Sequence, residues 1–346
     1  MKYSQLRKDL MKTELFDFNL PERLIAQTPA ERRSGSRLLI YDRKLDRVEH
    51  RQFSDIVEYF APGDLLILNS SKVIPARIFT ADTGYEILFV KQLANNCFEA
   101  MVRPGRRFKP GKRHQLPGGR VVEVVDVLAS GLRVLQAVDG LDVLPVFREF
   151  GEMPLPPYIT SRASSPDRYQ TVYSSLEGSI AAPTAGLHFD DQVFAALAKK
   201  QVAVAEVVLH VGLGTFKPIE SDSISEHRMH EEIFHVSEKT AELFKQTRQA
   251  GHRVWACGTT SVRTLESAIG SNGELKVGWQ ATDCFITPGY KFRAIDCFIT
   301  NFHLPRSTLI VLVASFCGRE KVLELYEEAI AKEYRFYSFG DSMLLL

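Results

Sequence analysis

Three histidines lie in turns that follow short apolar runs, and a neutral imidazole can accept or donate a proton near pH 7. His188 stands in IAAPTAGLHF, His210 in LHVGLGTFKP and His303 in TNFHLPRSTL. Each apolar run fits a buried strand, and a helix or a glycine-containing loop is predicted next to each histidine. We predict that these histidines transfer protons in an active site; the alternative for each is a structural role.

The same turns, together with CGTTSVRTLES at residues 257–267, contain residue types suited to binding a ligand. Small residues let the backbone approach a bound molecule, and a helix start has free N–H groups that can bind a carboxylate or phosphate. The predicted substrate-binding residues are Thr184, Ala185, Gly186, Phe189, Gly212, Gly214, Thr215, Phe216, Thr259, Thr260, Ser261, Arg263, Asn301 and Phe302. The sequence has no GxxxxGK[ST] or GxGxxG motif, which argues against an ordinary nucleoside triphosphatase or a dinucleotide dehydrogenase.

A metal site is considered because His227 and His230 form an HxxH motif and His235 is nearby. Zinc sites need a third or fourth well-placed ligand with outer hydrogen-bond support, and no cysteine pair is close in the sequence. We therefore predict no metal site.

A basic segment, RPGRRFKPGKRH, spans residues 103–114 and contains no acidic residue. Because the whole chain has a net charge of only +1, any nucleic-acid contact must come from such a local cluster. The six predicted phosphate-binding side chains are Arg103, Arg106, Arg107, Lys109, Lys112 and Arg113. The alternative is a solvated hairpin without a binding role.

The composition is that of an ordinary globular protein: 346 residues, of which 45% are hydrophobic and 25% charged, allow two domains. Five cysteines in apolar surroundings, without CxxC spacing, suit buried thiols in a reducing compartment. No apolar run is long enough to span a bilayer, and no secretory signal is recognisable at the start. We therefore expect a cytoplasmic protein.

The order of strand and helix patterns predicts two domains of different type. Short strands separated by turns fill residues 65–150 and predict a small β-barrel. Strands and helices alternate after the proline-rich GEMPLPPYI, which predicts an α/β fold with a mostly parallel sheet. The first 64 residues have too few strands for a core of their own. We therefore predict a discontinuous α/β domain (1–64 and 151–346) interrupted by the inserted barrel (65–150).

These motifs resemble the S-adenosylmethionine:tRNA ribosyltransferase-isomerase family of queuosine biosynthesis. The resemblance runs from DFNLPERLIAQTPAERR through KVIPARIF, GEMPLPPYI, IAAPTAGLHF, LHVGLGTFKPI, HRMHEE, GTTSVRTLES and TNFHLPRSTL to YRFYSFGDSMLL. It implies an α/β domain interrupted by a β-barrel. It also implies transfer and isomerisation of the ribosyl group of S-adenosylmethionine onto 7-aminomethyl-7-deazaguanine at the tRNA wobble position, forming epoxyqueuosine-tRNA with release of adenine and methionine.

The resemblance implies that S-adenosylmethionine is consumed as a substrate, that no additional cofactor is needed and that tRNA is the partner. The chain is expected to be a monomer, although nothing in the sequence decides the oligomeric state. Phe189, Phe216 and Phe302 could stack on adenine or face the sulfonium. Lys72 stands where the family usually has an arginine, so the role of that position is open. A tRNA methyltransferase and a non-catalytic tRNA-binding relative are the alternatives, and their products would distinguish them.

Overall fold

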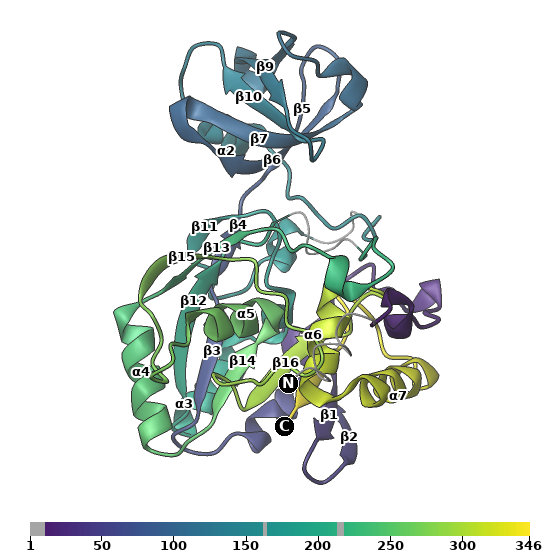
Figure 1. Ribbon diagram of the computed structural model, residues 1–346, viewed down its shortest axis with the longest axis vertical. Coiled ribbons are helices and arrows are strands. Elements are labelled where there is room, and N and C mark those ends of the chain that lie inside the picture. Colours follow the sequence, from purple (N-terminus) through teal and green to yellow (C-terminus); the bar gives the residue numbers. More distant parts are fainter. Residues whose placement is uncertain (1–10, 162–164, 213–217) are drawn as a thin grey trace. The chain divides into compact units, whose positions relative to one another are not determined.

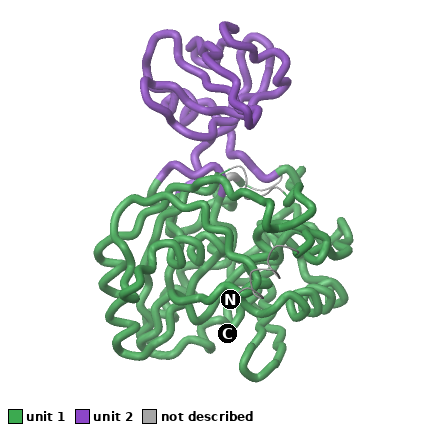
Figure 2. Tube along the Cα trace, in the orientation of Figure 1, with its two compact units in different colours: residues 1–71, 157–176, 182–346 green, residues 72–156, 177–181 purple. Residues whose placement is uncertain are grey.

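The computed structural model describes residues 11–161, 165–212 and 218–346. The chain divides into two compact units (Figure 2). The larger one, here the α/β unit, takes in residues 1–71, 157–176 and 182–346, and the smaller one, here the β unit, takes in residues 72–156 and 177–181. Each unit consists of segments that are separate in sequence, and the main segment of the β unit, 72–156, starts a few residues after the predicted start of the insertion at 65.

A nine-stranded sheet forms the centre of the α/β unit (Figure 1). Its strands, in spatial order, are β15 (Gly278–Thr282), β13 (Glu232–Val236), β12 (Ala203–Leu209), β3 (Leu65–Asn69), β14 (Val254–Cys257), β16 (Cys297–Asn301), β17 (Ser342–Leu345), β1 (Arg37–Asp42) and β2 (Arg47–Gln52). The four neighbours β12, β3, β14 and β16 are parallel, and β1 is parallel to β17. The other four pairings are antiparallel, so the sheet is mixed and the expectation of a mostly parallel sheet holds for its centre.

Strand β3 corrects one prediction. The run LLILN, residues 65–69, was expected in the inserted barrel, but it pairs with β12 and β14 in the middle of the large sheet. All five of its residues are buried. A strand covered on both faces is apolar throughout, and this pattern alone does not reveal which sheet receives it.

Helices cover the large sheet, and several begin at a polar cap. They are α3 (Asp191–Lys199), α4 (Glu238–Gln249), α5 (Gly258–Ala268), α6 (Thr308–Cys317) and α7 (Arg319–Ala331). Asp190, Ser237 and Ser307 each accept a hydrogen bond from a backbone N–H in the first turn of α3, α4 and α6. Every described helix is too short or too polar to cross a membrane.

Short 3-10 helices fill many connections. They are η1 (Thr13–Phe16), η2 (Glu22–Leu24), η3 (Arg33–Gly35), η4 (Phe53–Tyr59), η5 (Ala94–Asn96), η6 (Gly105–Arg107), η7 (Pro117–Gly119), η8 (Pro166–Tyr169), η9 (Thr184–His188) and η11 (Ile224–Glu226). Two of them, η4 and η9, contribute to a buried cluster with Phe53, Phe189 and Trp255. Phe53 of this cluster packs against the ring of His188 at 5.1 Å between centroids.

The β unit is a six-stranded antiparallel sheet with one helix. Its order is β5 (Arg77–Phe79), β6 (Glu86–Gln92), β7 (Cys97–Arg103), β10 (Arg133–Ala137), β9 (Val121–Val127) and β8 (Arg113–Gln115), and the helix is α2 (Leu144–Phe150). A separate pair joins β4 (Ser71–Val73) to β11 (Leu176–Ser179). Phe89, Phe98 and Phe147 pack together in the core.

The predicted barrel is only partly closed. In the described residues β5 and β8 form the two ends of the strand order and share no ladder. One backbone hydrogen bond of 2.8 Å joins Ala81 N, just after β5, to the oxygen of Gln115, the last residue of β8. The β unit is therefore a curled half-barrel.

Candidate active site

A small cavity of about 30 Å³ lies in the α/β unit where β14 and β16 end and α5 and α6 begin. In a parallel sheet the carboxyl ends of the strands are the usual place for ligands. Its walls are mainly small apolar residues and hydroxyl-bearing side chains, namely Ala182, Pro183, Thr184, Ala185, Val211, Gly258, Thr259, Thr260, Thr300, Asn301, His303 and Leu309. The structure thus brings together Thr184, Ala185, Thr259, Thr260, Asn301 and His303 from the predicted site.

The start of α5 forms one wall of this cavity. Gly258 has φ +84°, a conformation that side-chain-bearing residues rarely adopt, so a glycine is needed where β14 turns into the helix. The capping position, Cys257, makes no side-chain cap, and the first N–H groups of an α-helix have no partner within the helix. Thr260 Oγ1 is buried without a hydrogen-bond partner among the described residues. This wall therefore offers hydrogen-bond donors to a ligand.

Ser261 differs from its two neighbours. Its hydroxyl donates to Cys257 O at 2.6 Å, and the side chain is fully buried. The prediction that Ser261 contacts a ligand is therefore wrong in this structure, because its hydroxyl is used within the first turn of α5.

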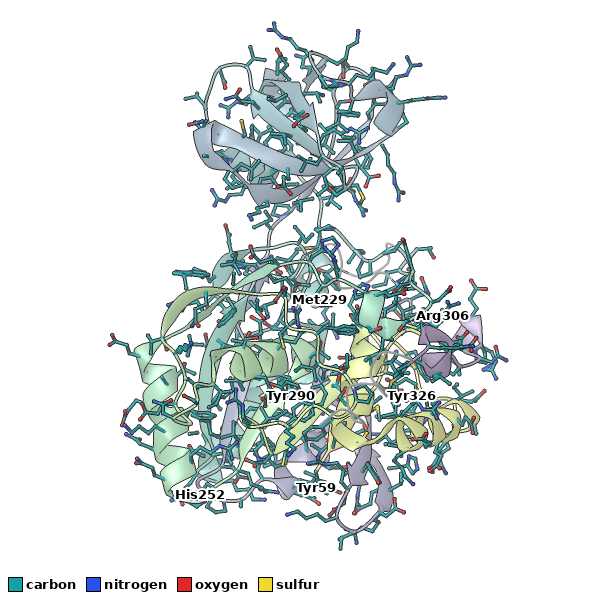
Figure 3. The ribbon with its side chains drawn as sticks, in the orientation of Figure 1. Tyr59, Met229, His252, Tyr290, Arg306 and Tyr326 are labelled. Carbon is teal, nitrogen blue, oxygen red and sulfur yellow. The ribbon has the colours of Figure 1, made fainter. Side chains whose placement is uncertain are left out.

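His303 is the predicted proton-transfer residue that lines the cavity. Thr300 Oγ1 is 2.7 Å from His303 Nε2, and the backbone N–H of His303 donates to the hydroxyl of Tyr326, a residue of α7 labelled in Figure 3. Burial lowers the pKa of His303 to about 3, so the ring is neutral at pH 7. In the part of the chain that is described, Nδ1 of His303 has no protein partner, so this nitrogen can interact with a ligand.

His188 lies behind the cavity wall and not on it. Its Nδ1 is 2.7 Å from Ser36 Oγ, and its Nε2 is 3.1 Å from Nδ2 of Asn301. Burial and the charges of Arg335 and Arg33 lower the pKa of His188 to about 3. Because both ring nitrogens already have partners inside the protein, the predicted role of His188 in proton transfer does not fit this arrangement.

His210 lies at the end of β12, next to the cavity residue Val211 but outside the cavity lining. Its Nδ1 is 2.9 Å from Ser71 Oγ, and its ring stacks on Trp279 at 5.8 Å between centroids. Burial lowers the pKa of His210. The structure therefore separates the three predicted histidines into one cavity residue and two neighbours.

Two predicted stacking partners are core residues. Phe189 and Phe302 are fully buried. The ring of Phe189 packs edge-on against Phe53 at 5.0 Å, and that of Phe302 packs on Phe336 at 4.9 Å. Neither residue lines the cavity, and in this structure both rings pack in the core instead of being available to stack on adenine or face the sulfonium.

Gly186 also serves packing. A Cβ atom at this position would lie 1.9 Å from the hydroxyl of Tyr173, so only glycine leaves room for that ring. Gly186 is not among the cavity residues, whereas its neighbours Thr184 and Ala185 are. The predicted close approach at Gly186 is therefore to a side chain and not to a ligand.

Arg263 supports a turn and does not line the cavity. It forms a buried ion pair with Glu232, and its Nε donates to Cys284 O at 3.1 Å. Glu232 Oε1 in turn accepts from the backbone N–H of Gly212 at 3.1 Å. Arg263 and Gly212 are predicted to bind substrate, but in this structure they have another role. Arg263 pairs with Glu232, and Glu232 holds the backbone of Gly212 just after β12. The predicted residues Gly214, Thr215 and Phe216 lie outside the described part of the chain.

The predicted basic cluster forms an exposed surface of the β unit. Arg103, Arg106, Arg107, Lys109, Lys112 and Arg113 are all exposed. Arg113 forms an ion pair with Glu123 at 2.8 Å. The other five cations of the set have no ion pair within the described residues. Phe108 is fully buried and stacks on His114 at 4.0 Å, so the segment is anchored by an aromatic pair while its cations face solvent.

No group of three or more His, Cys, Asp or Glu side chains in the described residues has the arrangement needed for a metal ion. His227 packs against Phe285, and His235 packs against Trp279. Two of the three histidines considered as metal ligands, His227 of the HxxH motif and the nearby His235, thus pack against aromatic rings.

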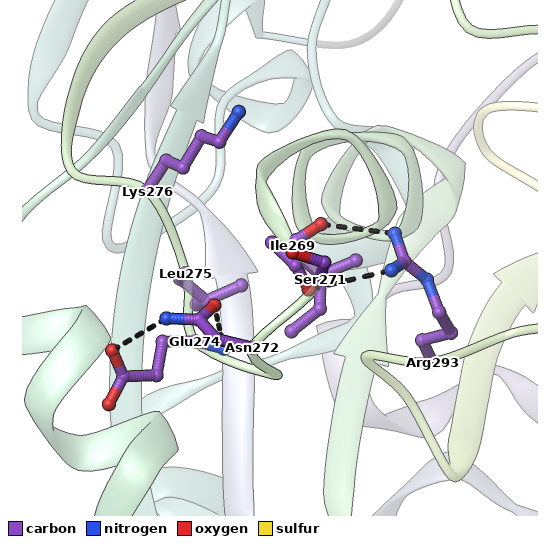
Figure 4. Close-up of a pocket in the computed structure, with 8 residues that line it drawn as sticks. Ile269, Ser271, Asn272, Glu274, Leu275, Lys276 and Arg293 are labelled. Carbon is purple, nitrogen blue, oxygen red and sulfur yellow. Dashed lines mark hydrogen bonds between the residues drawn. The ribbon is translucent and has the colours of Figure 1, made fainter.

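A larger hollow of about 570 Å³ lies at the turn after α5 (Figure 4). Three of its polar side chains take part in hydrogen bonds within the protein: Arg293 donates to Ile269 O at 3.0 Å, and Asn272 donates to Glu274 at 3.0 Å. None of the predicted site residues lines it. We therefore place the candidate site at the smaller cavity.

Sequence reasoning missed the residues that hold the site together. Ser36, Tyr326, Tyr337 and Glu232 each contact a predicted site residue, but they are 20 or more positions away in sequence. Their residue types are common, and no motif connects them to the turns they support. Only the fold reveals them.

Comparisons with known proteins identify the family of the chain. The family model described as queuosine biosynthesis protein matches residues 13–345. S-adenosylmethionine:tRNA ribosyltransferase-isomerases from Heliobacterium modesticaldum and Clostridioides difficile are 48% and 46% identical to this chain, over 97% of it and 100% of their own length. The crystal structure of S-adenosylmethionine tRNA ribosyltransferase from Thermotoga maritima is similar with a TM-score of 0.55 and 37% identity, covering 96% of this chain and 100% of that one. The chain therefore belongs to the family of queuosine biosynthesis proteins that contains the S-adenosylmethionine:tRNA ribosyltransferase-isomerases.

Proposed function

We propose that this chain transfers the ribosyl group of S-adenosylmethionine to 7-aminomethyl-7-deazaguanine at the wobble position of a tRNA. The transferred group is isomerised to give epoxyqueuosine-tRNA, and adenine and methionine are released. The observation that carries this proposal is the identity of 46% to 48% with enzymes of that name along their whole length. The reaction takes place in the cytoplasm, where both substrates occur.

The cavity supports a binding site for one end of S-adenosylmethionine. The N-terminus of α5 attracts an anionic group through its free N–H groups and helix dipole. We assign the methionine carboxylate to this wall, next to Thr259 and Thr260. The cavity of about 30 Å³ admits a group the size of one or two water molecules, so the nucleoside extends outside it.

The chemistry requires at least one proton-transfer group. A sulfonium acidifies the adjacent C5′ hydrogens, a base takes one of them, and the carbanion that forms helps to expel adenine, which an acid protonates. The amine of the tRNA base then attacks the opened ribose, and epoxide closure expels methionine. His303 is our candidate for one of these transfers because its Nδ1 is available at the wall of the cavity from which the C5′ end of the bound substrate extends. No metal or redox cofactor takes part in this scheme, because the sulfonium itself provides the activation.

The tRNA contacts in this proposal involve the β unit as well. Arginine and lysine side chains neutralise phosphates without reading sequence. The exposed cluster from Arg103 to Arg113 has the required charge and accessibility. We assign it to the phosphate backbone, and we assign recognition of the modified base to the α/β unit.

Product analysis tests the proposal. Purified protein is incubated with S-adenosylmethionine and tRNA that carries 7-aminomethyl-7-deazaguanine, and small molecules are separated by chromatography. Free adenine and methionine in equal amounts are expected. S-adenosylhomocysteine would indicate a methyltransferase, and the absence of any product with intact tRNA binding would indicate a non-catalytic relative.

A further inference from the structure

The amide of Asn301 has only one orientation that its neighbours allow. Nδ2 is 3.2 Å from the carbonyl oxygen of Tyr337 and 3.1 Å from Nε2 of His188. A carbonyl oxygen can only accept, so the amide nitrogen and not the amide oxygen must face Tyr337. Tyr337, whose carbonyl oxygen accepts this hydrogen bond, has φ +72°, an uncommon conformation for a residue with a side chain. The orientation of Asn301 therefore follows from chemistry.

This orientation also determines the tautomer of His188. Because Nδ2 of Asn301 donates, Nε2 of His188 must accept, and the ring proton must lie on Nδ1. Nδ1–H then donates to Ser36 Oγ, whose hydroxyl donates to Arg33 O at 3.4 Å. The four groups form a one-way chain of donors that ends on a backbone carbonyl. A second proton on His188 would place two N–H groups against each other, and the lowered pKa of this ring agrees with a neutral form.

The chain leaves one polar atom pointing toward the candidate site. Asn301 lines the cavity and is 2% exposed, and its Oδ1 has no hydrogen-bond partner among the described residues. A buried carbonyl oxygen without a partner costs free energy, so such an atom usually has a ligand or water that donates to it. The start of α5, with its N–H groups and Thr260, faces the same cavity. The residues that line the cavity therefore combine hydrogen-bond donors at the start of α5 with an unpartnered acceptor on Asn301.

We propose that His188 is a positioning residue that holds the Asn301 amide so that Oδ1 accepts a hydrogen bond from the α-ammonium group of S-adenosylmethionine. This inference rests on the proposed function, and it limits the cavity to the two charged groups of the substrate's amino-acid end, while the rest of the substrate extends outside it. The carboxylate binds at the start of α5, and the ammonium donates to Asn301 Oδ1. The size of the cavity favours this end over adenine, whose ring system requires more than about 30 Å³.

Two substitutions at His188 distinguish positioning from proton transfer. The amide oxygen of His188→Gln reaches about as far as Nε2 and accepts from Asn301, but glutamine does not exchange protons near neutral pH. His188→Leu removes the acceptor. A positioning role predicts that His188→Gln keeps kcat within about fivefold of wild type and that His188→Leu weakens S-adenosylmethionine binding by on the order of tenfold. A loss of about 10² or more in kcat for folded His188→Gln, with normal substrate affinity, would overturn the proposal because it is the mark of a lost acid or base.

The acceptor is tested by direct binding, which does not depend on turnover or on folding of the His188 variants. Calorimetry compares wild type and Asn301→Ala with two ligands: S-adenosylhomocysteine, which has the amino-acid end, and 5′-methylthioadenosine, which lacks it. Asn301→Ala is expected to lower the affinity for S-adenosylhomocysteine on the order of tenfold and to leave the affinity for 5′-methylthioadenosine unchanged. Unchanged affinity for S-adenosylhomocysteine, or an equal loss for both ligands, contradicts the assignment of the ammonium to Asn301.

Failure of the proposed function would look different. In that case wild-type protein would release no adenine from S-adenosylmethionine in the presence of modified tRNA, whatever the variants do. Failure of the present inference would leave wild-type turnover intact and would appear only in the comparison of variants.

Discussion

The cavity of the α/β unit and the basic cluster of the β unit use polar side chains in opposite ways. In the cavity the polar groups are buried and neutral, and each hydrogen bond around Asn301 and His188 has a determined direction. In the basic cluster the side chains are exposed and cationic, and among the described residues an ion pair restrains Arg113. A substitution in the cavity leaves a buried polar group without its partner and is therefore costly in free energy. A single substitution in the basic cluster removes one exposed charge and is tolerated.

This difference indicates how two recognition tasks are separated. A buried acceptor or donor discriminates strongly because a ligand that lacks the matching group leaves it unsatisfied. Exposed cations contribute affinity that depends on salt and little on sequence. We therefore expect mutations in the cavity to change catalysis and small-molecule binding, and mutations in the basic cluster to change only tRNA affinity.

The largest effect is expected for His303→Gln, which keeps a hydrogen-bonding side chain but cannot transfer a proton. Loss of one general acid or base lowers a rate by about 10² to 10⁴. Adenine release under saturating substrates measures this change, and His252→Gln, at an exposed histidine labelled in Figure 3, is the matched control. Wild-type turnover in folded His303→Gln would remove His303 from the chemistry.

A large loss of stability is expected for Arg263→Met. Arg263 and Glu232 are both buried, and removing the cation from such a pair typically costs about 3 to 5 kcal/mol. The double variant Arg263→Met with Glu232→Leu removes both charges and should be less destabilised than Arg263→Met alone. Denaturant unfolding of the three proteins measures this order, and equal stability of wild type and Arg263→Met would show that the pair does not hold the turn at Gly212.

An intermediate effect is expected for the basic cluster. Changing Arg106, Arg107 and Lys109 to Ala should weaken tRNA binding and reduce the slope of log affinity against log salt by about two to three, since each phosphate contact contributes about 0.7 to 0.9. S-adenosylmethionine affinity should not change. Binding is measured at several salt concentrations.

The control for this experiment has the same change in net charge at another surface. Lys44, Arg47 and Arg51 are exposed residues of the α/β unit, and their replacement by Ala should leave the salt slope as in wild type. Equal slopes for the cluster variant and wild type would mean that the cluster is a solvated hairpin.

The smallest effect concerns pH. The pKa of His188 in the folded chain, about 3, lies below its ordinary value near 6.5, so between these values the unfolded chain binds a proton that the folded chain does not. Stability therefore falls as pH falls through this window. His188→Gln removes this contribution, so its free energy of unfolding between pH 6 and pH 4.5 should change less steeply than that of wild type, by about 1.4 kcal/mol per pH unit. Identical slopes would show that His188 titrates normally.

The sequence predicts much of the fold because hydrophobic period and polar caps are local signals. Apolar spacing in the sequence predicts helices at 190–200, 239–250, 261–269 and 309–316, which correspond to α3, α4, α5 and α6. It also predicts strands at 202–209 and 253–257, which correspond to β12 and β14. The strand β3 was assigned to the wrong sheet, because a short buried run does not specify its partners.

For the site, local signals identify the turns but not the direction of each side chain. Thr184, Thr259, Thr260, Asn301 and His303 line the cavity as predicted. The rings of Phe189 and Phe302 turn into the core. A turn between a strand and a helix has one side toward the core and one toward a ligand, and residue type does not decide between them.

Isotope labelling shows directly which group of S-adenosylmethionine is transferred to the tRNA. S-adenosylmethionine is prepared with ¹³C in the ribose or, separately, in the methyl group, and the nucleosides of the modified tRNA are analysed by mass spectrometry after the reaction. If the ribosyl group is transferred, the ribose label enters the wobble nucleoside and the methyl label leaves with methionine, and this is the result we expect. A methyl label in the tRNA, or a tRNA without any label in the presence of released adenine, would contradict it.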